Sequence, residues 1–174
     1  MMTCRTYRPA YEVLRPRADV KYRPVEVSGM TDLKQPYTIL ITDDDRGVRD
    51  ALSEIVQARG FRPCHATCGE EALEIVEAEP IHLVLLDMHM PGLTGLETLQ
   101  LVRQVNALLP AILITADATL ELIRQAFHAH VFSVIPKPVN KNVVLTTVVR
   151  ALIKVYGVTE DRRSDTTHNP TKEN

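Results

Sequence analysis

The chain has 174 residues, of which 45% are hydrophobic and 24% charged, as in an ordinary soluble globular protein. This length suits one domain with extensions better than two full domains. The net charge of −2 is unevenly distributed, since residues 1–36 carry +3, residues 37–157 carry −4 and residues 158–174 carry −1. The acidic central segment argues against direct nucleic-acid binding there.

The two ends of the chain lack the periodic patterns of helices and strands. Residues 1–36 combine four prolines with scattered arginines, and residues 158–174 are polar. Such segments bury too little apolar surface to fold alone. We therefore expect a disordered N-terminal extension and a disordered C-terminal tail around a domain at 37–157.

Regular hydrophobic patterns run from Tyr37 to Tyr156 and alternate between the periods of strands and helices. We predict strands at 38–42, 62–66, 81–86, 111–115 and 131–135. A helix follows each strand, at 48–59, 70–78, 96–105, 120–128 and 140–156, and Gly60 ends the first of them. Five strand–helix units with apolar strands predict an α/β fold, in which a parallel sheet is covered on both faces.

Polar side chains stand where these predicted strands end. The first strand runs into Asp43, Asp44 and Asp45, and the third ends at Asp87. The other two groups are Thr115, at the end of the fourth strand, and Lys137, just after the fifth. Because parallel strands end at one edge of the sheet, we expect these groups to gather at that edge.

The predicted cluster combines several carboxylates with one hydroxyl and one ammonium. Carboxylates brought together repel each other, and a hard divalent cation such as Mg²⁺ relieves that repulsion. A carboxylate can also accept a phosphoryl group, and phosphoryl transfer needs mainly positioning and charge neutralisation. The cluster therefore predicts Mg²⁺-dependent phosphoryl chemistry.

Four stretches of the chain together resemble the receiver domain of two-component response regulators, from about Tyr37 to Tyr156. They are I-L-I-T-D-D-D, L-V-L-L-D-M-H-M-P-G-L-T-G, I-L-I-T-A-D and V-I-P-K-P-V. Each is a weak signal alone, but four in the right order at strand ends are a strong one. The resemblance implies a flavodoxin-like (βα)5 doubly wound sandwich with a five-stranded parallel sheet.

The resemblance also implies a role for each residue of the cluster. Asp87 would accept the phosphoryl group, while Thr115 and Lys137 would contact its oxygens. Asp43, Asp44 and Asp87 would hold Mg²⁺ together with the backbone carbonyl of His89. The Lys137–Pro138 bond would be cis, which a bond before proline accepts at low cost.

Three positions depart from the family pattern. Val134 stands where the family usually has an aromatic residue, three positions before the lysine. His130 and Val131 replace a frequent Gly-Ala pair, and Thr94 replaces an aspartate. The site residues are intact, so these changes put the aromatic readout in doubt rather than phosphorylation.

Several residues also have simpler interpretations. We predict that Asp45 caps a helix rather than binding metal. Cys64 and Cys68, with His65 between them, lack the second ligand pair of a metal site, so we favour ordinary thiols. An odd, low cysteine count, no apolar run of about 18 residues and no secretory signal predict a cytoplasmic protein without a membrane span.

The preferred function is a single-domain signalling switch, phosphorylated by a sensor histidine kinase or a histidine phosphotransfer protein and acting on an unknown protein target. We expect no direct nucleic-acid contact, no membrane contact, and a monomer or weak dimer. A phosphohydrolase with an aspartate nucleophile is one alternative, although His89 stands where such enzymes place a second aspartate. A receiver-like adaptor that is not phosphorylated is the other.

Overall fold

Five strands and five helices alternate along the computed structural model, which describes residues 36–157. The strands are β1 (Thr38–Thr42), β2 (Arg62–Ala66), β3 (Leu83–Asp87), β4 (Ala111–Thr115) and β5 (Ser133–Pro136). The helices are α1 (Arg46–Gln57), α2 (Gly69–Ala78), α3 (Gly95–Val105), α4 (Leu120–His128) and α5 (Lys141–Tyr156). The expectations for the extension and the tail concern 1–35 and 158–174, which lie outside the described residues.

All strands are parallel and lie in the order β2-β1-β3-β4-β5. The chain therefore crosses from β1 to one side of the sheet and later returns past it to β3. In open parallel sheets, ligands bind beyond the carboxyl ends of the strands at such a switch point. The strand order places that point between β1 and β3 and confirms the doubly wound α/β fold.

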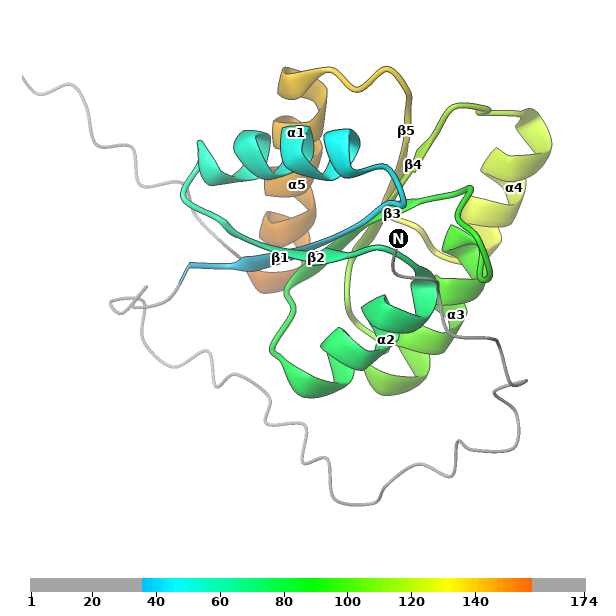
Figure 1. Ribbon diagram of the computed structural model, residues 1–174, viewed down its shortest axis with the longest axis horizontal. Coiled ribbons are helices and arrows are strands. Elements are labelled where there is room, and N and C mark those ends of the chain that lie inside the picture. Colours follow the sequence, from blue (N-terminus) through cyan, green and yellow to red (C-terminus); the bar gives the residue numbers. More distant parts are fainter. Residues whose placement is uncertain (1–35, 158–174) are drawn as a thin grey trace, which may run out of the picture.

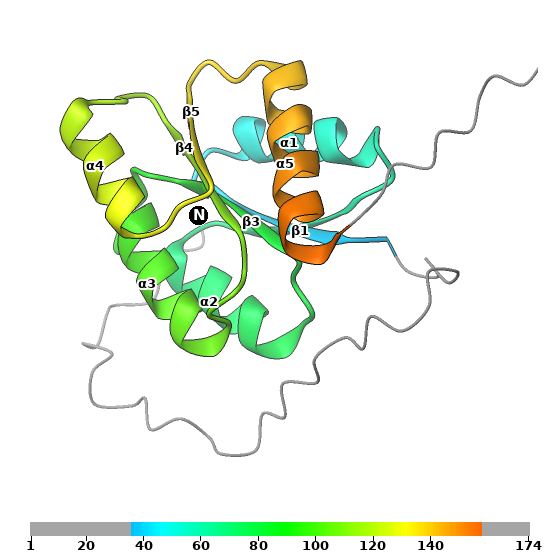
Figure 2. The ribbon, with the colours of Figure 1, turned by 180° about the vertical axis from the view of Figure 1, so that it is seen from behind.

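Helices cover both faces of the sheet, as Figures 1 and 2 show, and each face has its own core. Successive residues of each strand point to opposite faces. Leu40, Val84 and Leu113 pack with residues of α2, α3 and α4, whereas Ile41, Leu85 and Ile112 pack with residues of α1 and α5. This burial on both faces explains why the strands are continuous apolar runs.

Polar side chains fix where most of the helices begin. Asp45 caps α1, because its carboxylate accepts the backbone N–H groups of Gly47 and Val48. This confirms the prediction for Asp45 and separates it from the two aspartates before it. Thr94, Thr119 and Asn140 cap α3, α4 and α5 in the same way.

Two strands begin later than the pattern predicts. β3 starts at Leu83 instead of 81, because the Nδ1 atom of the His82 ring accepts the backbone N–H of Thr38 at 3.0 Å. β5 starts at Ser133 instead of 131, because the N–H of Val131 still donates to Ala126 at the end of α4. In both cases a contact with another element competes with strand pairing.

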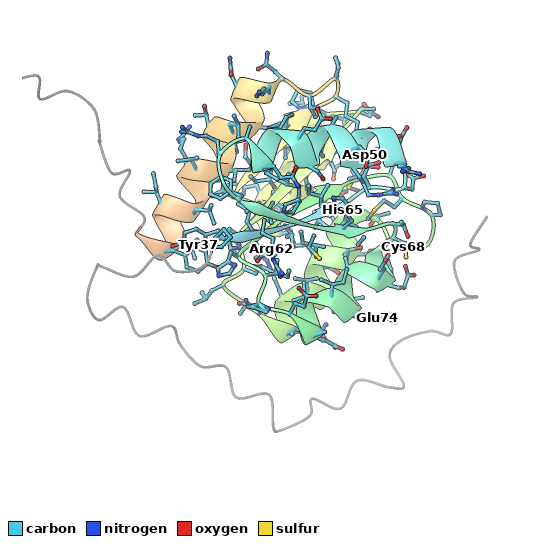
Figure 3. All side chains as sticks on the ribbon, turned by 60° about the vertical axis from the view of Figure 1, so that its left-hand side comes forward. Tyr37, Asp50, Arg62, His65, Cys68 and Glu74 are labelled. Atoms are coloured by element: carbon cyan, nitrogen blue, oxygen red, sulfur yellow. The ribbon has the colours of Figure 1, made fainter. Side chains whose placement is uncertain are left out.

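Strand β2 lies at one edge of the sheet and carries Cys64 and His65, two of the residues considered as a metal site. Figure 3 labels His65 on this strand and Cys68 just before α2. Cys64 packs against the core under α2, while the ring of its neighbour His65 bonds Ser53 of α1. Among residues 36–157, these three side chains form no cluster able to hold a metal, and neither Cys64 nor Cys68 forms a disulfide.

None of the helices between residues 36 and 157 is long and apolar enough to cross a membrane.

Candidate functional site

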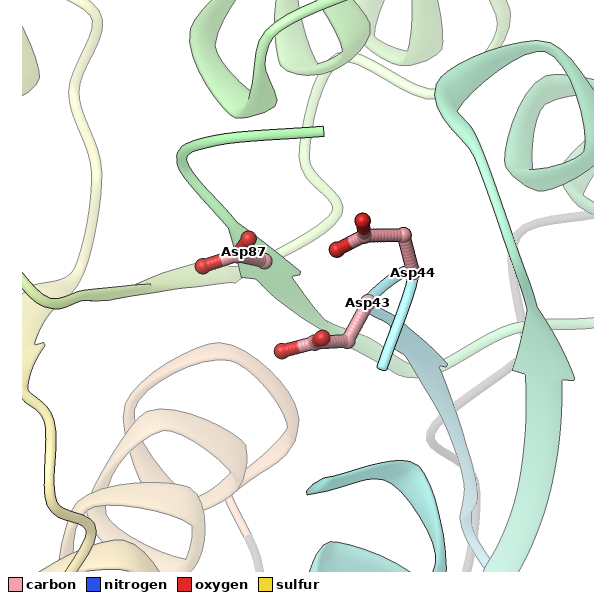
Figure 4. Close-up of side chains that lie close together, drawn as sticks. All are labelled: Asp43, Asp44 and Asp87. Carbon is pink, nitrogen blue, oxygen red and sulfur yellow. The ribbon is translucent and has the colours of Figure 1, made fainter. Parts of the chain in front are cut away.

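Three aspartates meet beyond the carboxyl ends of β1 and β3. Asp43 and Asp44 follow β1, and Asp87 is the last residue of β3. One carboxylate oxygen from each lies within 4.8 Å of those of the other two (Figure 4). Asp43 and Asp87 are almost completely buried, whereas Asp44 is exposed. The structure therefore brings together the three aspartates that the strand ends predicted would meet.

Lys137 joins two of these carboxylates. Its Nζ atom lies 2.8 Å from Asp43 and 3.0 Å from Asp87. The lysine follows β5 and is anchored by its backbone N–H, which donates to the carbonyl of Thr115 at 2.7 Å. The Lys137–Pro138 peptide is cis, as expected. One ammonium is therefore shared by two buried acids that lie more than forty residues apart in sequence.

Burial and charge shift the pKa values at the site. Burial raises the pKa of Asp87, an effect opposed by the bond from Lys137 and increased by the negative charge of Asp43. Burial by itself lowers the pKa of Lys137, but its bonds to Asp43 and Asp87 outweigh this and raise it. The lysine therefore stays protonated, and the buried carboxyl of Asp87 is harder to ionise.

Thr115 and His89 lie beside the cluster. Thr115 is fully buried at the end of β4. Its hydroxyl accepts the N–H of Asp117 at 3.1 Å and donates to the backbone carbonyl of Asp117 at 3.3 Å. The hydroxyl is thus bonded within its own loop rather than to Asp87. His89 has an exposed side chain, and its backbone N–H bonds the Asp87 carboxylate.

Two supporting contacts are not visible in the sequence. Arg49 of α1 donates to the backbone carbonyl of Asp43 at 2.6 Å and so fixes the end of β1. At Gly95, where α3 begins, an added Cβ would lie 2.4 Å from the carbonyl oxygen of Asp87. A glycine therefore lets α3 start directly against the end of β3. The glycine can be noticed in the sequence, but its close approach to the Asp87 carbonyl follows only from the tertiary fold.

The donor set fits a divalent cation. Three carboxylates and one ammonium leave two excess negative charges at the carboxylate edge, which one Mg²⁺ would balance. Oxygens on opposite sides of Mg²⁺ lie about 4 Å apart, so three oxygens within 4.8 Å fit one ion after a small movement or through a water. Asp43, Asp44 and Asp87 would hold the ion.

The strand order, the acids after β1 and β3 and the lysine after β5 define a class, the CheY-like α/β receiver proteins. A family model for the response regulator receiver domain matches residues 39–149. The chain belongs to this family, which confirms the resemblance noted from its motifs. Family membership also disfavours the interpretation as an aspartate-nucleophile phosphohydrolase.

The chain is similar to receiver proteins from several organisms. The chain is 32% identical over 114 residues to sporulation initiation phosphotransferase F of Bacillus subtilis, covering 66% of this chain and 92% of that protein. A CheY-like receiver domain protein from Methanospirillum hungatei superimposes with a TM-score of 0.66 at 28% identity, over 69% of this chain and 96% of that one. TrrA of Thermotoga maritima, solved with Mg²⁺ and BeF, gives a TM-score of 0.61 at 30% identity, over 67% and 99% of the chains.

Other relatives are longer than the matching region. The chain is 33% identical over 136 residues to the transcriptional regulatory protein CpxR of Escherichia coli, covering 78% of this chain and 57% of CpxR. It spans 24% of a putative NtrX-like response regulator of Rickettsia bellii. The likeness to such proteins therefore concerns their receiver domains.

Proposed function

We propose that this chain is a Mg²⁺-dependent phosphoacceptor switch that receives a phosphoryl group on Asp87 and signals through protein contacts. The observation that carries the proposal is the cluster of Asp43, Asp44 and Asp87 around one shared lysine. The Mg²⁺ and BeF bound in the TrrA structure fit the same chemistry, since BeF resembles a phosphoryl group.

Each residue has a task in this switch. Asp87 is the nucleophile, and its bonds to Lys137 and to the N–H of His89 hold its carboxylate in one orientation. Lys137 pairs with a phosphoryl oxygen after transfer, since its ammonium can exchange one carboxylate for another anion. Asp43, Asp44 and Asp87 would hold a Mg²⁺ ion, which when bound would neutralise negative charge on the phosphoryl oxygens. The Thr115 hydroxyl can leave Asp117 and donate to the phosphoryl group.

The transfer from the donor histidine to Asp87 needs no oxidant, reductant or second substrate. A carboxylate oxygen of Asp87 forms a bond to phosphorus as the bond between phosphorus and the donor imidazole nitrogen breaks. The electron pair leaves with that nitrogen, and solvent supplies its proton. The donor in this proposal is a histidine kinase or a histidine phosphotransfer protein. Water later attacks the phosphorus, the bond between phosphorus and the Asp87 oxygen breaks, and inorganic phosphate leaves the restored carboxylate.

An exposed apolar face supports signalling through protein contacts. On α4, Leu120 and Phe127 are 75% and 77% exposed, and Ile123 lies between them on the same helix. Val134 of β5 is only partly exposed and packs against the core under α4. We infer that a protein target reads this face without the aromatic switch residue usual in the family. A modification can only bias arrangements that already exist, so α4 is the element to monitor.

Incubation of the full chain with acetyl phosphate, with and without Mg²⁺, tests the proposal by intact mass. We expect the mass of one phosphoryl group to be added only when Mg²⁺ is present. Asp87→Asn should abolish the gain. Asp50→Asn, an equivalent change at an exposed aspartate that pairs with Arg46, should leave it intact.

A wild-type chain that binds Mg²⁺ but never gains mass would refute the switch and favour the unphosphorylated adaptor. Equal labelling of wild type and Asp87→Asn would instead place the acceptor at another residue. A histidine kinase as sole donor should give the same dependence on Asp87.

A further inference from the structure

A groove of about 760 Å³ lies between α3 and α4. The two helices run side by side on the same face of the sheet in both views of Figures 1 and 2. None of the three clustered aspartates and neither Thr115 nor Lys137 lines it. Its volume lies within the range of small-molecule sites in proteins. Its lining comprises Met88, Thr94, Leu96, Glu97, Leu99, Gln100, Arg103, Gln125, His128, Ala129 and His130.

Arg103 of α3 contributes the permanent positive charge of this groove. One of its terminal nitrogens, Nη2, donates to the backbone carbonyl of His130 at 2.7 Å, which links α3 to the segment after α4. Its Nε atom is buried and has no hydrogen-bond partner in the described part of the chain. A buried donor without a partner costs free energy and calls for an explanation. Because Nε is buried, a ligand in the groove would meet the terminal nitrogens of the guanidinium rather than this atom.

His130 provides an independent observation at the same place. Its φ angle is +53°, the left-handed region, and it is the only non-glycine residue with a positive φ between 36 and 157. Glycine adopts this conformation without strain, whereas a residue with a Cβ does not. The chain keeps an imidazole at a position that favours glycine, and that imidazole lines the groove. The positive φ belongs to the end of α4, where the N–H groups of His130 and Val131 donate to the carbonyls of Phe127 and Ala126, and this turn places the imidazole at the groove.

The charges along the groove are complementary to an anion. The only acid in the lining is Glu97, and its carboxylate is engaged by the N–H and hydroxyl of Thr94. Arg103 and two histidines remain as donors, with the amides of Gln100 and Gln125 beside them. Met88, Leu96 and Ala129 supply apolar surface. The groove thus combines donors for an acidic group with an apolar wall.

We propose that the groove between α3 and α4 binds a small organic anion, with its carboxylate or phosphate group at Arg103 and His130 and its apolar body against Met88 and Leu96. The proposal concerns a site distinct from the aspartate cluster and does not depend on phosphorylation of Asp87. Its failure would leave the proposed switch intact.

A titration of the ¹⁵N-labelled full chain in EDTA, followed by amide chemical shifts, tests this proposal. The probes are phenyl phosphate and benzoate, with benzyl alcohol as the neutral match and inorganic phosphate as the anion without an apolar body. We expect saturable shifts at Arg103, His130 and neighbouring amides with both organic anions. Binding by benzyl alcohol and by inorganic phosphate should be weaker by about tenfold or more. Benzyl alcohol lacks the negative charge, and inorganic phosphate lacks the apolar body.

Two variants keep the test independent of folding. Arg103→Gln should weaken binding by about tenfold, the loss of a hydrogen bond to a charged group, whereas Arg150→Gln, an exposed arginine on α5, should not. His130→Gly removes the strained side chain, so it should keep or raise the unfolding temperature while still weakening binding.

Three outcomes would overturn the proposal. They are the absence of saturable shifts in the groove, equal affinity for the neutral probe, and unchanged affinity in a folded His130→Gly protein. Preference for phenyl phosphate over benzoate, or the reverse, would identify which acidic group the natural ligand carries.

Discussion

At the scale of single residues, the sharing of Lys137 between two acids controls the site. Asp43 and Asp87 are both buried, with side chains 2% and 5% exposed, and each relies on the same ammonium. Burying a charge is costly unless it is paired, and here one cation serves two anions. The arrangement is therefore electrostatically incomplete until a further cation binds, which favours metal binding over stability of the metal-free fold.

Neutralising Asp87 should stabilise the metal-free protein. Because its pKa is raised by burial above the ordinary 3.8, ionisation of Asp87 costs stability once the pH exceeds that value. Asp87→Asn removes this cost, and Lys137 keeps its bond to Asp43. In EDTA at pH 7.5 we expect the variant to unfold at a higher temperature, with about 2–4 °C for each kcal/mol relieved.

The sign of this effect can be checked by pH. The advantage of Asp87→Asn should shrink as the pH falls toward 3.8, because wild-type Asp87 then becomes protonated as well. Added Mg²⁺ should stabilise wild type more than the variant, since one metal ligand has been lost. A variant less stable than wild type in EDTA at neutral pH would contradict the assignment.

At the scale of elements, the start of α3 is tied together by reciprocal bonds. Thr94 accepts the N–H of Glu97, while the Glu97 carboxylate accepts the N–H and hydroxyl of Thr94. This is a capping box. It stands between Asp87 and the helix that carries Arg103, so it fixes the loop that follows Asp87. The family usually has aspartate here, and threonine provides the same capping function.

Thr94→Ala should lower the free energy of unfolding by about 1 kcal/mol, the usual cost of losing a cap. The bonds from the N–H and hydroxyl of Thr94 hold the pKa of Glu97 below its ordinary 4.5. Their contribution is therefore present above that pH and lost as the pH falls through the lowered folded value. Chemical denaturation at pH 7 and pH 4 should show a larger deficit at pH 7.

A matched threonine substitution provides the control. Thr146→Ala, at an exposed position on α5, should change stability by less than about 0.5 kcal/mol at either pH. A deficit for Thr94→Ala that did not change between the two pH values would show that the Glu97 carboxylate contributes little to the cap.

At the scale of the whole molecule, His82, which lies just before β3, contacts β1 and α5 at the edge opposite the aspartates. Its ring accepts the backbone N–H of Thr38 at the start of β1, and its carbonyl accepts the hydroxyl of Tyr156 at the end of α5. The rings of Tyr37 and Tyr156 pack within 6 Å of it, at centroid distances of 5.0 and 5.8 Å. The beginning and the end of the described domain are thus both held by one residue, through its ring and its backbone carbonyl.

Stability should depend on the protonation of His82. Burial and the charge of Arg62 lower its pKa below 6.5. The unfolded chain therefore binds the proton more readily, so the contribution of His82 is present above pH 6.5 and declines as the pH falls below it. His82→Gln should lose about 1 kcal/mol at pH 7.5 and show a smaller loss of stability between pH 7.5 and 5 than wild type.

Thermal unfolding across this pH range measures the difference. His128→Gln, which changes an exposed histidine on α4, should retain the pH dependence of wild type. If His82→Gln also retained it, another group would be responsible.

Most of the fold could be predicted from the sequence, because local patterns carry it. The periods of apolar residues gave all ten elements, and the polar residues at strand ends predicted that Asp43, Asp44 and Asp87 would meet. The starts of β3 and β5 were predicted two residues too early. The first error involves the bond between His82 and Thr38, which lie far apart in sequence, and the second involves the bond from Val131 to Ala126 at the end of α4. The first helix, expected at 48–59, also lies two residues earlier, at Arg46–Gln57.

The sequence by itself determined the strand–helix order, the burial of both sheet faces and the residue types at the carboxylate edge, since these follow from hydrophobic periodicity and from the parallel arrangement. Only the tertiary structure decided that Lys137 bonds both Asp43 and Asp87 and that Arg103 links α3 to His130. Side-chain direction and pairing depend on which distant backbone lies within about 3 Å, and that distance is set by the packing of the whole domain.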